Sequence, residues 1–297
     1  MTGAETGFLL LTSQLGNPER RVLTTAQLRV LGQRVRQMAV DDPGRQLQQE
    51  DLRALGYGED MARRIVALLD EEELLEYYCL QGLKKDCACL SRISAGYPAV
   101  LRQRLGDDSP GCLWAKGDLT LLSAPKIALV GSRELQEENR RFAAEVGRQA
   151  ALQGYVLVSG NARGADKTAQ EACLKAGGSV ISVVADRLES HSMRENMLYL
   201  SEDGFDQNFS AQRAIGRNRV IHALAQKTFV AQCGYQSGGT WDGTVKNLRF
   251  GWSAVYCYAD GSPAQQLLQE MGAQALDMRQ LAALDQLENL DTGLFDQ

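Results

Sequence analysis

From residue 126 onward, short apolar runs alternate with longer stretches in which apolar residues recur at helical spacing. The runs occupy residues 127–130, 156–158, 180–184, 228–231 and 254–257. Helices are expected from the first run to about residue 153, after the second run, near 215–226 and near 240–249. Uninterrupted apolar strands separated by helices are typical of a parallel sheet covered on both faces. We therefore predict an α/β fold with a doubly wound, mostly parallel sheet, in which ligands bind beyond the carboxyl ends of the strands.

Residues 1–90 follow a different pattern, because apolar residues recur at helical spacing and no strand-like alternation competes. Two amphipathic sets flank residues 55–58, where Gly56 and Gly58 interrupt the helical pattern. This predicts a small N-terminal helical domain of the helical-hairpin or SAM-like type. Its glycine turn either contacts the DNA backbone or is purely structural, and both interpretations stay open.

Residues 91–125 contain Pro98, Pro110 and Pro125 and are predicted to form a connector with a short strand and turn at 113–118. The third predicted unit spans residues 126–297 and ends in an acidic tail with about two short helices. Residues 126–259 carry 16 Lys/Arg against 13 Asp/Glu, whereas residues 260–297 carry 1 against 7. An anionic ligand is therefore expected in the middle segment.

The 297-residue chain is 44% hydrophobic and 23% charged, which is ordinary for a globular protein. No segment reaches the roughly 18 apolar residues of a membrane span, and the apolar run at 8–11 is too short for a signal peptide. We expect a cytoplasmic protein without membrane contact. The seven cysteines are expected as reduced thiols, since no Cys-x-x-Cys pair occurs. No metal is predicted; a site at Cys79, Cys87 and Cys89 is the alternative.

Residues 159–166, Ser-Gly-Asn-Ala-Arg-Gly-Ala-Asp, follow the second apolar run and precede a helix. Gly160 and Gly164 allow a ligand to approach the backbone closely, and the helix N-terminus supplies unpaired N–H groups. Arg163 adds a fork of donors suited to phosphate. The stretch predicts an anion site, although a purely structural turn would use the same glycines.

Three further groups follow strands or begin helices at the same edge of the predicted sheet. They are Gly131, Ser132 and Arg133; Gly216 to Ile221, which includes Arg217, Asn218 and Arg219; and residues 237–244, which begin with Ser237 and Gly238. Turn geometry requires glycine but not repeated arginine, so the groups together favour a phosphate-binding edge. Arg219 and Asp166 have ion pairs inside the fold as an alternative role. Lys167 either reaches phosphate or is solvated.

In this order, the four groups resemble the motifs of the DNA-processing protein A (DprA/Smf) family. The matching segments are 131–133, 159–166, 217–221 and 237–244, and residues 97–101 and 116–119 look like the family's lead-in to the first strand. The resemblance covers about residues 90–260. Asn161 stands where the family usually has Leu, Gln170 where it often has His, and Phe209 lies well before Arg217. We expect a divergent member without the C-terminal winged-helix domain.

The resemblance implies an extended Rossmann-like domain that binds single-stranded DNA and loads the recombinase RecA onto it during natural transformation. It also implies a homodimer and no enzymatic activity. The pocket positions that it carries over are Arg133, Ser159, Gly160, Arg163, Gly164, Arg217 and Asn218. With the argument from individual residues, the expected DNA- or phosphate-binding residues are Gly131, Ser132, Arg133, Ser159, Gly160, Arg163, Gly164, Lys167, Arg217, Asn218, Ser237 and Gly238. We expect no catalytic residue, cofactor or metal.

Two other functions use the same edge of the sheet. A nucleotide-sensing module would need the same arginines and glycines. A nucleoside-monophosphate phosphoribohydrolase would use a Pro-Gly-Gly-x-Gly-Thr-x-x-Glu motif, which Ser237 to Thr240 echoes, but no glutamate follows Thr244 to act as acid or base. A dinucleotide dehydrogenase is disfavoured, because no Gly-x-Gly-x-x-Gly follows the first strand.

Overall fold

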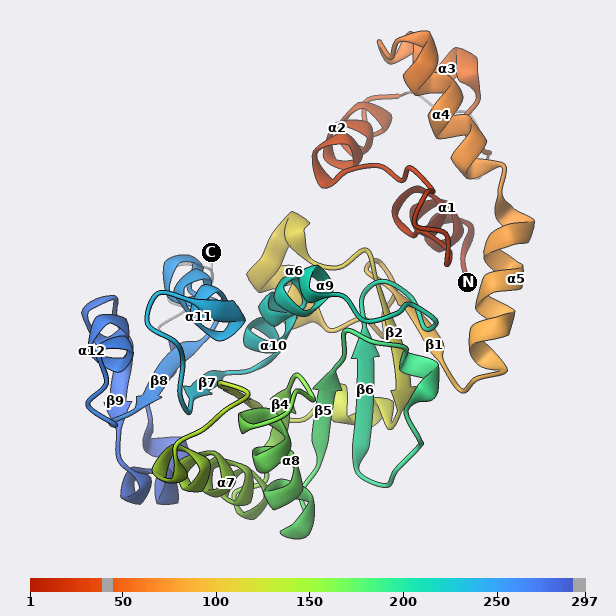
Figure 1. Ribbon diagram of the computed structural model, residues 1–297. Coiled ribbons are helices and arrows are strands. Elements are labelled where there is room, and N and C mark those ends of the chain that lie inside the picture. Colours follow the sequence, from red (N-terminus) through yellow and green to blue (C-terminus); the bar gives the residue numbers. More distant parts are fainter. Residues whose placement is uncertain (39–44, 291–297) are drawn as a thin grey trace.

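A sheet of nine strands organises the described part of the chain, residues 1–38 and 45–290, in this computed structural model (Figure 1). The strands are β1 (Ala88–Ser91), β2 (Cys112–Gly117), β3 (Lys126–Val130), β4 (Val156–Ser159), β5 (Val180–Val183), β6 (Met197–Ser201), β7 (Lys227–Val230), β8 (Ala254–Tyr258) and β9 (Gln274–Leu276). Their order is β1-β2-β6-β5-β4-β3-β7-β8-β9. All neighbours from β6 to β9 pair in parallel, whereas β1 and β2 are antiparallel at one edge. The predicted mostly parallel α/β sheet is confirmed.

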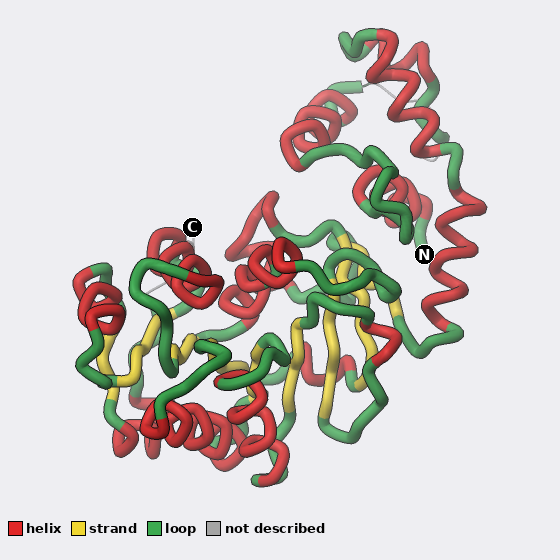
Figure 2. The backbone as a smooth tube through the Cα atoms, in the orientation of Figure 1, coloured by secondary structure: helices red, strands yellow, loops and turns green. Residues whose placement is uncertain are grey.

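Helices cover both faces of this sheet. They are α6 (Ala99–Leu105), α7 (Glu137–Leu152), α8 (Ala165–Lys175), α9 (Ala211–Gly216), α10 (Asn218–Leu224), α11 (Gly238–Phe250) and α12 (Pro263–Glu270), with the 3-10 helices η1 (Gly106–Asp108), η2 (Leu119–Leu122), η3 (Leu188–Ser190) and η4 (Met278–Gln286). One buried cluster joins α7, α8 and η4 to the sheet, and a second joins α6, α10, α11 and α12. Figures 1 and 2 show α7 and α8 below the strands and α10 and α11 above them.

The inner strands are largely apolar because they are buried on both faces. In β3, Ile127 and Leu129 belong to the cluster between the sheet and helices α7 and α8. Ala128 and Val130 belong to the cluster between the sheet and α10. All four are at most 6% exposed. This burial accounts for the uninterrupted apolar runs.

The chain winds away from β3 in two directions. β4, β5 and β6 follow on one side, and β7, β8 and β9 lie on the other. The strand order therefore reverses between β3 and β7, and the loops that leave these strands part at their carboxyl ends. In doubly wound folds this switch point is where ligands bind.

The helical N-terminus consists of α1 (Gly3–Thr12), α2 (Thr25–Val35), α3 (Gln49–Ala54), α4 (Glu59–Leu69) and α5 (Glu72–Leu83). These helices share a small core that includes Leu31, Leu52 and Ile65. Helices α1 and α5 also join the main core, where the Tyr78 ring lies 5.2 Å from that of Trp114, between centroids. The predicted helical N-terminal region is confirmed, and it packs directly on the sheet.

Some elements differ from the sequence prediction. Strands β1, β6 and β9 were not expected, and the boundary predicted after residue 90 falls inside β1. The division into residues 1–90, 91–125 and 126–297 stays a prediction. Within the described ranges, no helix combines the length and apolar character needed to cross a membrane.

Candidate nucleic-acid interface

A groove of about 1060 Å³ opens at the switch point. Its lining comes from the loops after β3, β4 and β7, from α9 and from the starts of α10 and α11. Eight of the twelve predicted site residues line it, namely Gly131, Ser132, Arg133, Arg163, Arg217, Asn218, Ser237 and Gly238. The other four, Ser159, Gly160, Gly164 and Lys167, do not.

Arg133 and Arg163 are the exposed cations of this groove. Neither side chain makes a hydrogen bond or ion pair with a residue of the described ranges. They lie on adjacent loops that contact each other: the loops are so close that a Cβ at Gly164 would overlap the Arg133 carbonyl. Gly164 also has a φ of +83° and ends its loop at the start of α8. The two guanidinium groups are therefore available to an anion.

Asp166 holds the loop that follows β4. Its buried carboxylate accepts hydrogen bonds from the backbone N–H of Gly160 at 3.0 Å and of Ala162 at 3.2 Å. Burial raises the pKa of Asp166, and the positive charge of Arg217 opposes that rise. Asn161, between the two amides, has the left-handed φ of +59°. Asp166 therefore acts inside the fold, but through hydrogen bonds from backbone amides rather than through the ion pair that the sequence left open.

Four backbone amides of the 159–167 segment are engaged inside the fold, so these N–H groups are not free to bind an anion. Gly160 and Ala162 donate to Asp166, the N–H of Ala165 donates to the Ser132 carbonyl at 3.1 Å, and that of Lys167 donates to the Ala162 carbonyl at 3.2 Å. Nothing in the sequence around Asp166, three residues after Arg163, indicated that its carboxylate would accept hydrogen bonds from these backbone amides.

Arg217 lines the groove but is only 8% exposed. Its guanidinium donates to the carbonyl of Val183 at the end of β5 and to that of Ala214 at 3.3 Å. Gly160 lies directly beside it, and a Cβ there would overlap the guanidinium unless the arginine moved. Burial lowers the pKa of Arg217, and Asp166 opposes this. Arg217 thus ties the α9–α10 turn to the ends of β4 and β5.

Ser159 is fully buried and lies beneath the groove. Its hydroxyl accepts a hydrogen bond from Gln170 at 2.6 Å, and the same amide donates to Ser182 at 2.8 Å. The predicted contact between Ser159 and DNA is therefore not available in this structure. Lys167 is exposed on α8, outside the groove, and its side chain has no partner among the described residues.

Ser132 and Asn218 connect the elements that form the groove. The Ser132 backbone N–H and hydroxyl both donate to the Gln232 carbonyl, at 2.9 and 3.2 Å, which joins the β3 and β7 loops. The Asn218 amide donates to the Gly239 carbonyl at 2.9 Å and so joins α10 to α11. Gly131 allows α8 to approach, since a Cβ there would overlap that of Ala165.

The N-terminus of α11 opens into the groove through Gly238, Gly239 and Thr240. Ser237 makes no side-chain capping bond, and the first turn has no acidic residue. The first N–H groups of a helix have no acceptor within the helix, and the helix dipole favours an anion there. This helix start therefore has anion-binding features of the kind that the sequence predicted for residues 159–166.

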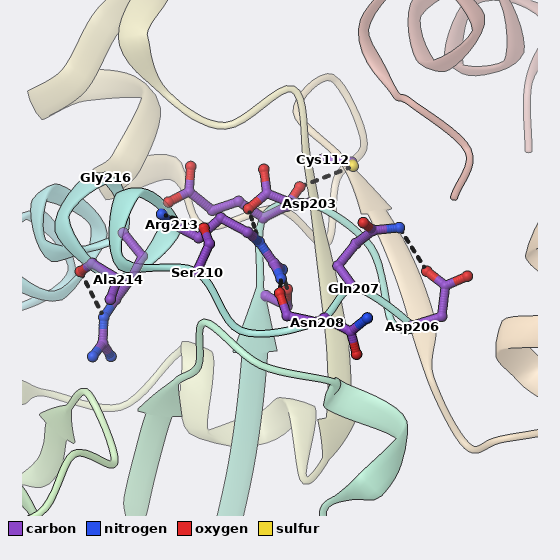
Figure 3. A network of polar contacts seen from close by, with 12 residues as sticks. Cys112, Asp203, Asp206, Gln207, Asn208, Ser210, Arg213, Ala214 and Gly216 are labelled. Atoms are coloured by element: carbon purple, nitrogen blue, oxygen red, sulfur yellow. Dashed lines mark hydrogen bonds and ion pairs between the residues drawn. The ribbon is translucent and has the colours of Figure 1, made fainter. Parts of the chain in front are cut away.

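Arg219 belongs to a separate polar network on the far side of the α9–α10 turn. It pairs with Glu202 at 2.5 Å, which is the internal ion pair left open by the sequence. Figure 3 shows Arg213 in the same network, pointing toward Asp203 and Asn208 on the loop between β6 and α9. Phe209, on that loop, is 56% exposed and does not line the groove.

The apolar side of the groove was not predicted from the sequence. Ala211, Ala214 and Ile215 of α9 form it, and Gln232 lies opposite, directly after β7. The position of Gln232 beyond a strand end was the available signal, whereas α9 was not predicted, because the helix expected near 215–226 corresponds to α10. The carboxylates that line the groove, within the described residues, are Glu134 and Asp166, and the latter is engaged by backbone.

All seven cysteines are free thiols. In residues 1–38 and 45–290, no group of three or more His, Cys, Asp or Glu side chains could hold a metal ion. The three cysteines of the alternative metal site, Cys79, Cys87 and Cys89, therefore do not form such a group.

The fold and the groove at its switch point place the chain among proteins with a Rossmann-like α/β fold. The family model for DNA recombination-mediator protein A matches residues 88–246, more than half of the chain. The chain belongs to this family, which confirms the resemblance to DprA/Smf proteins.

Two curated relatives show the level of similarity. The chain is 32% identical over 142 residues to the DNA processing protein DprA of Bacillus subtilis, covering 44% of this chain and 48% of that protein. It is 33% identical over 141 residues to that of Streptococcus pneumoniae, covering 44% and 50%. The chain thus spans about half the length of the curated relatives that it matches.

Solved structures extend the similarity beyond the matched segment. The crystal structure of Streptococcus pneumoniae DprA has a TM-score of 0.61 and 25% identity, covering 90% of this chain and 99% of that one. A structure of Helicobacter pylori DprA, described for its single-stranded DNA binding mode, has a TM-score of 0.55 and 23% identity, covering 66% and 94%. The latter supports the fold alone.

Proposed function

We propose that this protein binds single-stranded DNA in the switch-point groove and delivers the strand to a RecA-type recombinase, as in natural transformation. The observation that carries the proposal is the pair Arg133 and Arg163, two exposed guanidinium groups on touching loops with no partner among the described residues. The family description as a recombination mediator supports delivery to a recombinase. The proposal places the protein in the cytoplasm, acting by binding rather than catalysis.

The groove suits a strand better than a compact anion. Arginine forks hold phosphates, and the start of α11 adds backbone N–H groups on the opposite wall. Non-specific binding of single strands depends on such phosphate contacts and weakens as salt rises. Two free cations predict modest affinity, so a homodimer would gain by engaging one strand twice.

Binding is tested by fluorescence anisotropy with a labelled 20-nucleotide oligo-dT over a series of salt concentrations. Arg133→Ala and Arg163→Ala should each weaken binding about tenfold and reduce the salt slope by about one. Arg279→Ala is the matched control, since it removes an arginine whose side chain is 92% exposed and lies outside the groove. Wild-type affinity in both groove variants would refute the site.

Competition in the same assay distinguishes a strand from a nucleotide. Unlabelled oligo-dT should displace the probe, whereas thymidine monophosphate at micromolar concentration should not. Displacement by the mononucleotide would instead favour the nucleotide-sensing function.

Delivery is tested by adding the protein to a RecA-type recombinase with single-stranded DNA coated by a single-strand-binding protein. The recombinase's DNA-dependent ATP hydrolysis should begin sooner, and Arg163→Ala should remove this effect. Light scattering after size-exclusion chromatography tests the dimer independently. A stimulation that persists in Arg163→Ala would separate recombinase delivery from the groove.

A further inference from the structure

The loop between β7 and α11 closes in a tight turn at the edge of the groove. Gly234 and Ser237 form an antiparallel bridge, so Tyr235 and Gln236 occupy the tip of the turn. Gln236 has the left-handed φ of +48°, which fixes the reversal of the chain. Both bridge residues line the groove. Tyr235 is therefore held beside the groove by a defined turn.

The Tyr235 ring is 56% exposed, and its hydroxyl has no partner among the described residues. Its ring neighbour is Trp241, with centroids 6.3 Å apart and planes inclined by 45°. Trp241 is 8% exposed and belongs to the buried cluster under α11. An aromatic residue that is more than half exposed, contacts a buried ring and lies beside an anion groove is suited to stacking.

We propose that Tyr235 is a base-stacking residue for the strand as it leaves the groove. This inference rests on the proposed function, that of binding single-stranded DNA, and adds a residue that contacts the bases rather than the phosphates. In this arrangement Arg133 and Arg163 hold phosphates, and the ring takes the face of a neighbouring base. A duplex cannot use the ring in this way, because its bases are already stacked and paired. Any base offers such a face, so the contact is tolerant of sequence.

The test compares oligo-dT with an abasic oligonucleotide of the same length, which keeps the phosphates and removes the bases. Tyr235→Ala should weaken oligo-dT binding about tenfold and leave abasic binding nearly unchanged. Tyr235→Phe should bind as wild type, since the hydroxyl is not used. Tyr77→Ala is the control, because Tyr77 is 62% exposed on α5, away from the groove.

Tyr235→Leu separates stacking from support of the turn. Leucine retains an apolar contact with Trp241 but has no aromatic face, so it should lose oligo-dT affinity as alanine does, with an unchanged melting temperature. In wild type, 2-aminopurine fluorescence in the oligonucleotide should be quenched on binding, and Tyr235→Leu should remove that quenching. Wild-type oligo-dT affinity in both Tyr235→Ala and Tyr235→Leu would overturn the inference.

Failure of the proposed function has a different signature. If neither Arg133→Ala nor Arg163→Ala changed binding, the groove would not be the DNA site, and both proposals would fall. If those arginine variants lost affinity while the Tyr235 variants kept it on both oligonucleotides, the stacking inference alone would fall.

Discussion

Four arginines near the carboxyl ends of the strands can be compared in two regions, which differ in whether the guanidinium groups have partners within the fold. Arg133 and Arg163, on the loops after β3 and β4, are exposed and free of partners among the described residues. Arg217 and Arg219, at the α9–α10 turn, are engaged by Val183 and Glu202. The same residue type is therefore left unpaired within the described residues in the first region and connects parts of the fold in the second.

The two regions differ because a guanidinium group loses its hydration when it is buried and keeps it when it is exposed. A buried cation loses hydration, so it must recover hydrogen bonds and an opposite charge within the protein. Arg217 recovers two backbone carbonyls and the field of Asp166. Arg133 and Arg163 keep their hydration and give it up only when a ligand arrives. Exposure, more than charge, therefore distinguishes the two arginines that we propose as DNA contacts.

The largest expected effect comes from removing the buried member of this comparison. Arg217→Ala should lower the free energy of unfolding by about 3 kcal/mol or more, because it leaves the buried Asp166 carboxylate without its compensating charge. Arg163→Ala should change it by less than about 0.5 kcal/mol, as expected for an exposed side chain without partners. Urea denaturation measures both. Equal stability losses would contradict the division into two regions.

Gly164 should be the next most sensitive position. Gly164→Ala forces a side chain into a left-handed conformation and against the Arg133 carbonyl, at a combined cost of about 2–4 kcal/mol. Gly177→Ala is a matched control, because φ is similar at +80° and no atom lies within 4 Å of the added Cβ. It should cost only about 1 kcal/mol. Thermal denaturation of both variants isolates the contact between the loops, and equal losses would show that this contact contributes nothing.

The helix that follows Arg217, α10, carries a buried histidine, His222, whose protonation couples stability to pH. His222 is fully buried beside Thr228 and Asn247, and burial lowers its pKa to about 3. Between pH 6.5 and 3 the unfolded chain binds a proton that the folded chain does not, so stability falls as pH falls. The stability advantage of wild type over His222→Gln should shrink by up to about 1.4 kcal/mol per pH unit in this window. A constant difference measured by urea denaturation would show that His222 is protonated in the fold.

The parts of this fold that could be predicted from sequence are those set by local pattern. The strand at residues 127–130 could be predicted, because burial on both faces leaves an uninterrupted apolar run. Strand β6 could not, since the segment between β5 and β6 contains only the short η3 and breaks the alternation of strands with helices. The edge strand β1 has only four residues, which is too short for a recognisable pattern.

The candidate site divides in the same way. Its position at the switch point followed from strands that end in glycine and arginine. The use of the 159–166 amides by Asp166 did not, because a carboxylate at the start of a helix serves equally well in solvent. The burial of Arg217 depends on Gly160 and on the Val183 carbonyl, which are 57 and 34 residues away in sequence. Only the folded chain brings these groups together.

The smallest expected effect tests whether position or charge decides binding. Lys167 and Arg163 are four residues apart and carry the same charge, but only Arg163 lines the groove. Lys167→Ala should therefore weaken oligo-dT binding by less than about threefold, since a charge outside the contact acts only through the screened field. Arg163→Ala should weaken it by about tenfold. The two variants are compared by anisotropy at low and physiological salt, where the Lys167→Ala effect should disappear first. Equal losses at both salt concentrations would place Lys167 on the path of the strand, and the groove would then extend along α8 rather than toward Tyr235.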